Sequence, residues 1–320
     1  MTSLIDPINL KRLNKVNLFI IGAAKCGTTS LYNMLNQNEN ILMSTVKEPH
    51  FFSDDLTKNL STEYKNKFPF IDKNNMPINR HKSYIDSISD YKRLWDFDKE
   101  NIKYFGESSV SYLYSFSAPR RILNYNQDAK IIICLRNPFD RSYSHIMRDI
   151  SRGRFKNNLE DEVSNLEKPI NWDLDSGYIK LSLYSKFINN YLSIFEKNNV
   201  LILNFDDFKS IEIMEKKLSK FLKIDFKIKK TIISNKTPYV RNKHLMKLIN
   251  ILKNSILHNY LPKGLKNFIK NFFLKINYTN NSSPNSQRIK NLLNNYNYIF
   301  ENEILNLKKL GIKFNFEAWK

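Results

Sequence analysis

Three short runs of consecutive apolar residues form the clearest hydrophobic pattern in this chain. They are Leu18 to Ile21, Ile131 to Leu135 and Val200 to Phe205. Unbroken apolar runs of this length are typical of strands that are buried on both faces of a parallel sheet. Further short strands are predicted near Ile41 and at Tyr104 to Glu107. The pattern therefore predicts a parallel sheet at the core of an α/β protein.

Apolar positions at helical spacing predict helices between and after these strands. The predicted helices are Thr28 to Leu35, Pro119 to Tyr125, Tyr178 to Phe195, Ser210 to Phe221 and Ser286 to Leu310. A further helix is expected to carry Ser144, and the stretch from Arg148 to Lys168 is predicted to be basic and mobile. We expect a single domain over residues 1–320, with the sheet in 15–210, a variable insertion near 54–98 and a helical part in 211–320.

The first apolar run leads directly into a loop with two glycines, Gly22-Ala-Ala-Lys-Cys-Gly27, and then into the helix that begins at Thr28. In this arrangement the loop N–H groups and the positive end of the helix converge on a bound anion. Lys25 adds a positive charge, and Thr28, Thr29 and Ser30 add hydroxyl donors. An ordinary strand-to-helix turn is the alternative. In the nucleotide triphosphatase loop the lysine follows the second glycine, whereas here it precedes that glycine.

A second strand-to-helix junction strengthens the interpretation as an anion site. Arg136 directly follows the run Ile131 to Leu135, and Ser144 lies two helical turns further along. Open parallel sheets bind ligands at the carboxyl ends of their strands. The guanidinium and the hydroxyl are therefore expected to contribute to a ligand site at that edge.

These two segments together resemble the 5′-phosphosulfate loop and the 3′-phosphate-binding element of sulfotransferases that use 3′-phosphoadenosine 5′-phosphosulfate (PAPS). The resemblance covers roughly residues 15 to 319 and includes the motifs Lys47-Glu-Pro-His-Phe-Phe52, Phe105-Gly-Glu-Ser-Ser109, Gly177-Tyr178 and Leu203-Asn-Phe-Asp-Asp-Phe208. The chain is similar to bacterial sulfotransferases and to the domains that modify heparan sulfate. The resemblance implies a P-loop-type sheet flanked by helices. It also implies transfer of a sulfuryl group from PAPS, without a metal, to a hydroxyl or amine of a glycan or lipid-linked saccharide.

The resemblance further implies roles for individual residues. Lys25 is expected to meet the charge that develops on the leaving phosphate, and Arg136 and Ser144 are expected to bind the 3′-phosphate. The residues expected around the 5′-phosphate are Cys26, Gly27, Thr28, Thr29 and Ser30. Residues 235–241, which include Lys236 and Arg241, resemble the segment that closes over the nucleotide.

Two neighbouring residues compete for the role of catalytic base. Glu48 occupies the position that resembles the catalytic glutamate of the glycan-modifying branch, and His50 is its rival. A carboxylate beside an imidazole can orient the ring or take the proton itself, and burial raises the pKa of a glutamate. The structural alternatives are a surface ion pair between Glu48 and Lys47, and packing of His50 in the core against Phe51 and Phe52.

Composition adds limits on partners and location. The formal net charge of +20 favours anionic partners, but it does not choose among nucleotide, acidic glycan, nucleic acid and lipid, and a solvated basic surface is an equal alternative. The two cysteines do not suggest a disulfide scaffold. No stretch approaches the ~20 apolar residues of a membrane-spanning helix, and Met1 to Val16 does not resemble a signal peptide. A cytoplasmic location is therefore expected.

One departure from the family pattern concerns the acceptor. Heparan-type enzymes often carry a lysine after the glutamate where this chain has Glu107-Ser-Ser109, which puts a glycosaminoglycan acceptor in doubt. Two other functions stay open. A P-loop kinase acting on a small molecule is disfavoured by the position of Lys25 and by the lack of an evident second carboxylate for magnesium. A basic nucleic-acid-binding protein with a vestigial nucleotide fold is disfavoured by the intact Lys25, Arg136 and Ser144. We expect no specific nucleic-acid partner.

Overall fold

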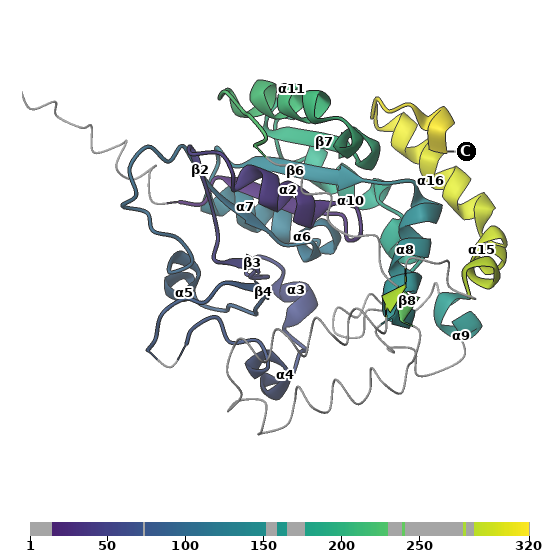
Figure 1. Cartoon of the computed structure of the whole chain (residues 1–320), viewed down its shortest axis with the longest axis horizontal. Coiled ribbons are helices and arrows are strands. Elements are labelled where there is room, and N and C mark those ends of the chain that lie inside the picture. Colours follow the sequence, from purple (N-terminus) through teal and green to yellow (C-terminus); the bar gives the residue numbers. More distant parts are fainter. Residues whose placement is uncertain are drawn as a thin grey trace, which may run out of the picture.

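The computed structural model describes residues 15–72, 74–151, 159–164, 177–229, 239–240, 278–279 and 285–319. Its centre is a five-stranded sheet made of β1 (Leu18–Gly22), β2 (Ile41–Met43), β5 (Tyr104–Ser108), β6 (Lys130–Leu135) and β7 (Val200–Asn204). The strand order is β2-β5-β1-β6-β7, and every neighbouring pair is parallel. The predicted parallel sheet is thus confirmed, and β1 lies in its middle (Figure 1).

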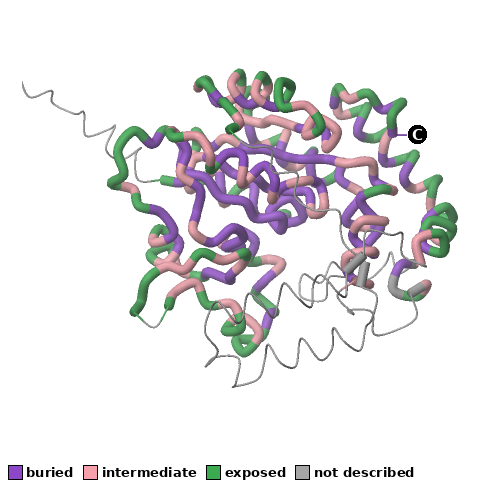
Figure 2. The backbone as a smooth tube through the Cα atoms, viewed as in Figure 1, coloured by how far each residue is buried: buried purple, intermediate pink, exposed green. Residues whose placement is uncertain are grey.

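The central strands are buried because their side chains are apolar on both faces. All residues of β1 are buried, and so are Ile131 to Leu135 of β6. Figure 2 shows this buried zone running through the middle of the molecule. The helices α2 (Thr28–Leu35) and α6 (Ser111–Tyr114) pack against β1, and α7 (Ala118–Tyr125) contacts α6. The core therefore holds β1 and the loop after it in a fixed position.

A small lobe is built on one side of the sheet (Figure 1). It contains a parallel pair of short strands, β3 (Val46–Glu48) and β4 (Arg80–Lys82). Its helices are α3 (Asp54–Thr57), α4 (Thr62–Asn66) and α5 (Ile88–Lys92). The expected insertion near 54–98 therefore supplies a strand that pairs with β3.

The remaining helices surround the other end and edge of the sheet. They are α8 (Pro138–Ser151), α9 (Leu159–Ser164), α10 (Ser185–Leu192), α11 (Ile211–Leu222), α15 (Ser286–Asn294) and α16 (Asn297–Lys309), with 3₁₀ turns η1 (Lys180–Ser182), η2 (Lys197–Asn199), η3 (Phe205–Lys209) and η4 (Phe316–Trp319). A two-stranded antiparallel pair, β8 (Tyr239–Val240) and β9 (Tyr278–Thr279), completes the described elements. Both α15 and α16 pack against α8.

The prediction of one helix from Tyr178 to Phe195 is wrong. The chain forms the 3₁₀ turn η1 and begins the helix α10 only at Ser185. The backbone oxygen of Tyr178 accepts bonds from Arg141 Nη1 at 2.7 Å and Ser142 Oγ at 3.0 Å. The N–H of Ser182 bonds instead to the oxygen of Ile179, at 2.8 Å, as in a 3₁₀ turn. Side chains of α8 therefore take the carbonyl that a continuous helix needs.

Two further predictions need correction. The single helix Ser286 to Leu310 is in fact two helices, α15 and α16, with a break at residues 295–296. The stretch from Arg148 to Lys168 is partly helical, because α8 continues to Ser151 and α9 begins at Leu159. The predicted nucleotide-closing residues Lys236 and Arg241 lie outside the described residues.

Candidate functional site

The loop between β1 and α2 has the form of an anion cradle. Gly27 stands before the first turn of α2 with φ 88°, a left-handed conformation that favours glycine. A Cβ at this position would lie 3.3 Å from the rings of Phe205 and Phe208. The first turn of α2 has no acidic residue to neutralise its positive end. Glycine thus suits both the left-handed conformation and the narrow space beside the two rings, at a helix end that attracts anions.

The side chains of this loop divide between the core and the site. Thr28 and Ser30 are buried at the start of α2, and Lys25 and Thr29 are half-buried. The N–H of Ala23 donates to the oxygen of Cys134 at 2.7 Å, so the loop is tied to β6. The loop therefore sits at the carboxyl ends of two neighbouring strands.

Cys26 points into the core. Its thiol lies 3.8 Å from the hydroxyl of Tyr184, and its N–H donates to the oxygen of Ala23 at 3.2 Å. Burial raises the pKa of the thiol to about 11, and the charges of Arg141 and Arg136 oppose this only in part. The thiol is therefore neutral at physiological pH and is not an activated nucleophile. A contact of Cys26 with the nucleotide stays a prediction.

Arg136 stands at the carboxyl end of β6, next to β1. Its guanidinium lies 4.7 Å from the ring centre of Phe205, and its Nη2 is 3.6 Å from Asp140 Oδ2. The Nε of Arg136 is buried without a hydrogen-bond partner among the described residues. Ser144 is half-buried on α8, two turns after Arg136. Because the ring of Phe205 also limits space at Gly27, it connects the two predicted phosphate-binding segments.

Glu48 lies at the end of β3 inside a cluster of cationic and imidazole groups. The Nζ of Lys47 is 2.8 Å from Oε1, and His50 Nε2 is 3.7 Å from Oε2. His81 Nδ1, on β4, is 3.8 Å from Oε1. Burial opposes the charge on Glu48, but these three neighbours outweigh it and lower the pKa to about 2. The carboxylate is ionised, and its pair with Lys47 is buried rather than on the surface.

His50 is held rigidly beside this carboxylate. Its Nδ1 is 2.7 Å from Ser111 Oγ, and its ring stacks on Tyr84 with the ring centres 5.1 Å apart. Its backbone N–H donates to Ser109 Oγ at 3.2 Å. Burial lowers the pKa of His50 to about 3, against the opposing charge of Glu48. The imidazole is therefore neutral at physiological pH. The ring is buried and stacks on Tyr84, and it also lies beside the carboxylate; its role as a base stays a prediction.

Glu107 links this cluster to the sheet. It is the penultimate residue of β5, and both of its oxygens accept bonds, one from Tyr91 OH at 2.8 Å and the other from Ser109 Oγ at 3.4 Å. Burial raises the pKa of Glu107 to about 8, and the hydrogen bonds oppose this shift. The N–H of Ser109 donates to the oxygen of Ile20 in β1 at 3.1 Å. The ends of β5, β1 and β6 thus bring Glu107, the loop and Arg136 to one edge of the sheet.

Arg141 on α8 was not predicted from the sequence, yet it supports the loop between β1 and α2. This fully buried side chain donates from Nε to the oxygen of Ala24 at 3.0 Å and contacts His145 Nδ1 at 2.7 Å. His145 Nε2 lies 3.5 Å from Asp149 Oδ2. The spacing of four residues between these three polar side chains places them on one face of α8. This spacing in the sequence could have predicted the polar cluster.

His81 was also not predicted, because its position depends on the pairing of two strands that are distant in sequence.

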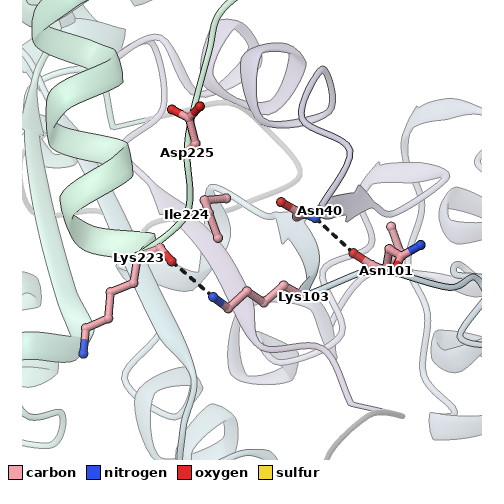
Figure 3. Close-up of a pocket in the computed structure, with 7 residues that line it drawn as sticks. Asn40, Asn101, Lys103, Lys223, Ile224 and Asp225 are labelled. Atoms are coloured by element: carbon pink, nitrogen blue, oxygen red, sulfur yellow. Dashed lines mark hydrogen bonds between the residues drawn. The ribbon is translucent and has the colours of Figure 1, made fainter.

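A separate open hollow of about 580 Å³ lies at the amino ends of β2 and β5 (Figure 3). It is lined by Asn40, Asn101, Ile102, Lys103, Lys223, Ile224 and Asp225. Within it, Lys103 Nζ donates to the oxygen of Lys223 at 3.1 Å. This hollow is at the opposite edge of the sheet from Lys25 and Arg136.

The described part of the chain contains neither a candidate metal site nor a candidate membrane-spanning helix. Across those residues there is no group of three or more His, Cys, Asp or Glu side chains placed to hold a metal ion. In the same ranges no helix is both long enough and apolar enough to cross a membrane.

A parallel sheet with a glycine-containing anion loop at its centre defines a P-loop-type α/β protein. The sulfotransferase domain family matches residues 15–263, and the chain belongs to this family of enzymes. The sulfotransferase from Alicyclobacillus acidocaldarius has a similar structure, with a TM-score of 0.54 and 27% sequence identity over 74% of this chain and 91% of that one. The P-loop-type fold and the family predicted from sequence are thus confirmed.

Two human proteins are also similar. Carbohydrate sulfotransferase 15 is 23% identical over 233 residues, which is 61% of this chain and 41% of that protein. Heparan sulfate glucosamine 3-O-sulfotransferase 5 is 26% identical over 180 residues, covering 55% and 44% of the two chains. The chain therefore spans less than half the length of these relatives.

Proposed function

We propose that this protein transfers a sulfuryl group from PAPS to a hydroxyl or amine of a carbohydrate acceptor. The observation that supports this most is the convergence at one edge of the sheet. Lys25 follows β1 and Arg136 follows the neighbouring β6. Glu48 lies beside His50, and the backbone N–H of His50 donates to Ser109 Oγ just after β5, which places Glu48 near the same edge. A nucleotide and an acceptor group meet there in this proposal.

The residues present suit PAPS. The backbone at Gly27 and the hydroxyls of Thr28, Thr29 and Ser30 are assigned to the 5′-phosphate. Arg136 is assigned to the 3′-phosphate with Ser144, and the unused buried Nε of Arg136 is a donor available for an anion. The predicted contacts of Lys236 and Arg241 complete the nucleotide site. PAPS supplies the activated phosphate–sulfate anhydride.

The reaction is an in-line displacement. The acceptor oxygen or nitrogen attacks the sulfur, the bond from sulfur to the bridging phosphate oxygen breaks, and 3′-phosphoadenosine 5′-phosphate leaves. Lys25 offsets the negative charge that grows on that phosphate. Glu48 takes the acceptor proton, since its carboxylate is ionised and more exposed than the ring of His50, with side-chain exposures of 11% and 1%.

The acceptor class is inferred from the relatives and from charge. The printed names of the similar human proteins specify carbohydrate and heparan sulfate glucosamine. The lobe strand β4 carries Arg80, His81 and Lys82 and places His81 beside Glu48, and such a basic strand suits an anionic saccharide. We assign acceptor recognition to the lobe around 54–98 and nucleotide closure to 211–320. A lipid-linked saccharide is included in this class, and a cytoplasmic location stays a prediction.

The alternatives are weaker. Membership of the sulfotransferase family disfavours a small-molecule kinase, as does Lys25 preceding Gly27. A nucleic-acid-binding role would leave the buried cluster around Glu48 unexplained.

The experiment compares wild-type protein with Glu48→Gln, using radiolabelled PAPS and a panel of desulfated glycosaminoglycan and lipid-linked saccharide acceptors. Loss of a general base should slow transfer by roughly 10²- to 10⁴-fold. Glu48→Gln should keep its affinity for 3′-phosphoadenosine 5′-phosphate. The matched control is Glu39→Gln, an exposed glutamate just before β2 and outside the lobe, which should transfer like the wild type. Wild-type rates in Glu48→Gln would exclude Glu48 as the base.

A further inference from the structure

The Glu48 carboxylate has an imidazole near each oxygen, and the two rings differ in exposure. His50 Nε2 is 3.7 Å from Oε2, and its side chain is 1% exposed. His81 Nδ1 is 3.8 Å from Oε1, and its side chain is 66% exposed. Of the described cationic and imidazole groups within 4 Å of Glu48, only His81 is largely open to solvent. One ring therefore closes the site and the other connects it with water.

The strand β4 fixes the place of His81. It pairs with β3 in parallel, with Val46 opposite Arg80 and Glu48 opposite Lys82. Backbone bonds hold both ends, from Arg80 N to the oxygen of Thr45 at 3.1 Å and from Ser83 N to the oxygen of Glu48 at 2.9 Å. His81 lies between these two bonds, so its backbone cannot drift away from Glu48.

Aromatic packing holds the same strand from the other side. The Nζ of Lys82 lies 4.3 Å from the ring centre of Phe68, 5.4 Å from Tyr84 and 5.5 Å from Tyr64. Tyr84 in turn stacks on His50. The lobe therefore holds β4 as a unit, with Lys82 among aromatic rings and His81 toward Glu48 and solvent.

The proposed reaction leaves a proton on Glu48 after each transfer. The low pKa of this carboxylate means that it does not keep the proton, and the next turnover needs Glu48 ionised again. Lys47 is buried, and its ammonium group has no lone pair that could accept the proton. Burial lowers the pKa of His50 to about 3, so His50 is also a poor acceptor.

We propose that His81 takes the proton from Glu48 through Nδ1 and releases it to water, which restores the carboxylate for the next acceptor. This inference rests on the proposed function. In the step, the O–H bond of protonated Glu48 breaks and an N–H bond forms on neutral His81. The imidazolium then loses its proton to solvent, so protons and charge balance.

The first test examines the coupling without any acceptor. The imidazole resonances of the protein are followed by NMR as a function of pH, and His81→Gln identifies the signal among the five histidines. In Glu48→Gln the pKa of His81 should fall, because the ring loses its anionic neighbour. The other groups that face the pair, Lys47, His50 and Lys82, are unchanged in this comparison. An unmoved pKa would overturn the proposal.

The second test measures transfer from radiolabelled PAPS to the best acceptor of the panel across pH. Wild-type turnover should fall below the pKa of His81, where the ring is already protonated. His81→Gln should lose this limb and turn over roughly 10- to 100-fold more slowly. His81→Lys keeps a positive charge but no group that accepts a proton near neutral pH, and it should be equally slow.

Chemical rescue separates proton transfer from a structural effect. Imidazole in the buffer should restore turnover to His81→Ala, because the position is exposed, and imidazoles of different basicity should restore it to different extents. Wild-type turnover in His81→Gln and His81→Lys, or slow turnover that imidazole does not restore, would overturn the role of His81. Failure of wild-type protein to bind 3′-phosphoadenosine 5′-phosphate would instead contradict the proposed function itself.

Discussion

Two buried glutamates near the site show how partners decide protonation. Glu48 and Glu107 are both buried, yet the pKa of Glu48 is lowered to about 2 and that of Glu107 is raised to about 8. Glu48 faces Lys47 and two imidazoles, whereas Glu107 receives only hydroxyl donors. Neutral donors do not offset the loss of hydration, but a cation at 2.8 Å does. One carboxyl is thus ionised at neutral pH, whereas the other is largely protonated.

Glu107 gives a pH-dependent stability. Because burial raises its folded pKa from 4.5 to about 8, its contribution to stability is complete below 4.5 and is lost as the pH rises toward about 8. Over this range the free energy of unfolding of wild-type protein should fall relative to that of Glu107→Gln, by up to roughly 4 kcal/mol. Urea unfolding at several pH values measures this, with Glu63→Gln as the control. Parallel pH profiles for wild type and Glu107→Gln would contradict the assignment.

At the scale of elements, α8 joins the two halves of the proposed nucleotide site. It begins just after Arg136 and carries Ser144, and its buried face carries Arg141 and His145. Arg141 bonds to the carbonyl oxygens of Ala24 and Tyr178, so α8 holds the anion loop and the turn η1 together. Any shift of this helix moves Arg136 and the loop as one unit.

We expect Arg141→Lys to weaken this connection. Lysine lacks the planar fork that reaches both carbonyls and His145, and it leaves buried polar groups without partners. The free energy of unfolding should fall by roughly 2 to 4 kcal/mol, and affinity for 3′-phosphoadenosine 5′-phosphate should fall with it. Arg121→Lys, in a partly exposed pair with Asp54, is the control and should change little. Unaltered stability and affinity in Arg141→Lys would exclude this role.

The predictable parts of the fold are those that local sequence specifies. The strand from Ile131 to Leu135 was predicted to within a residue because a short apolar run rich in β-branched isoleucine is typical of a buried strand. The helix at Tyr178 to Phe195 was mispredicted because Arg141, distant in sequence, takes a carbonyl oxygen there. The motif predicted that Glu48 and His50 lie near each other, and their side chains are 3.7 Å apart, whereas their catalytic roles stay predictions. His81 was not, because only the pairing of β3 with β4 brings it near Glu48.

At the scale of the whole molecule, the sheet separates two edges with different characters. The carboxyl ends of β1, β5 and β6 carry the anion loop, Glu107 and Arg136. The amino ends of β2 and β5 carry the open hollow at Lys103 and Asp225. The net charge of +20 draws anionic molecules toward the protein, and we assign selectivity to the arrangement at the carboxyl edge. The proposed acceptor chemistry depends on a nucleotide bound at this edge.

The most direct test is calorimetric titration of wild-type protein and Arg136→Ala with 3′-phosphoadenosine 5′-phosphate, ATP and ADP, without magnesium. We expect wild-type protein to bind 3′-phosphoadenosine 5′-phosphate more tightly than ATP or ADP. Arg136→Ala should lose roughly 10- to 100-fold of this affinity, because a charge-assisted bond to the 3′-phosphate is removed. Tighter binding of ATP, with a requirement for magnesium, or an unchanged affinity in Arg136→Ala, would contradict the assignment of this edge as a PAPS site.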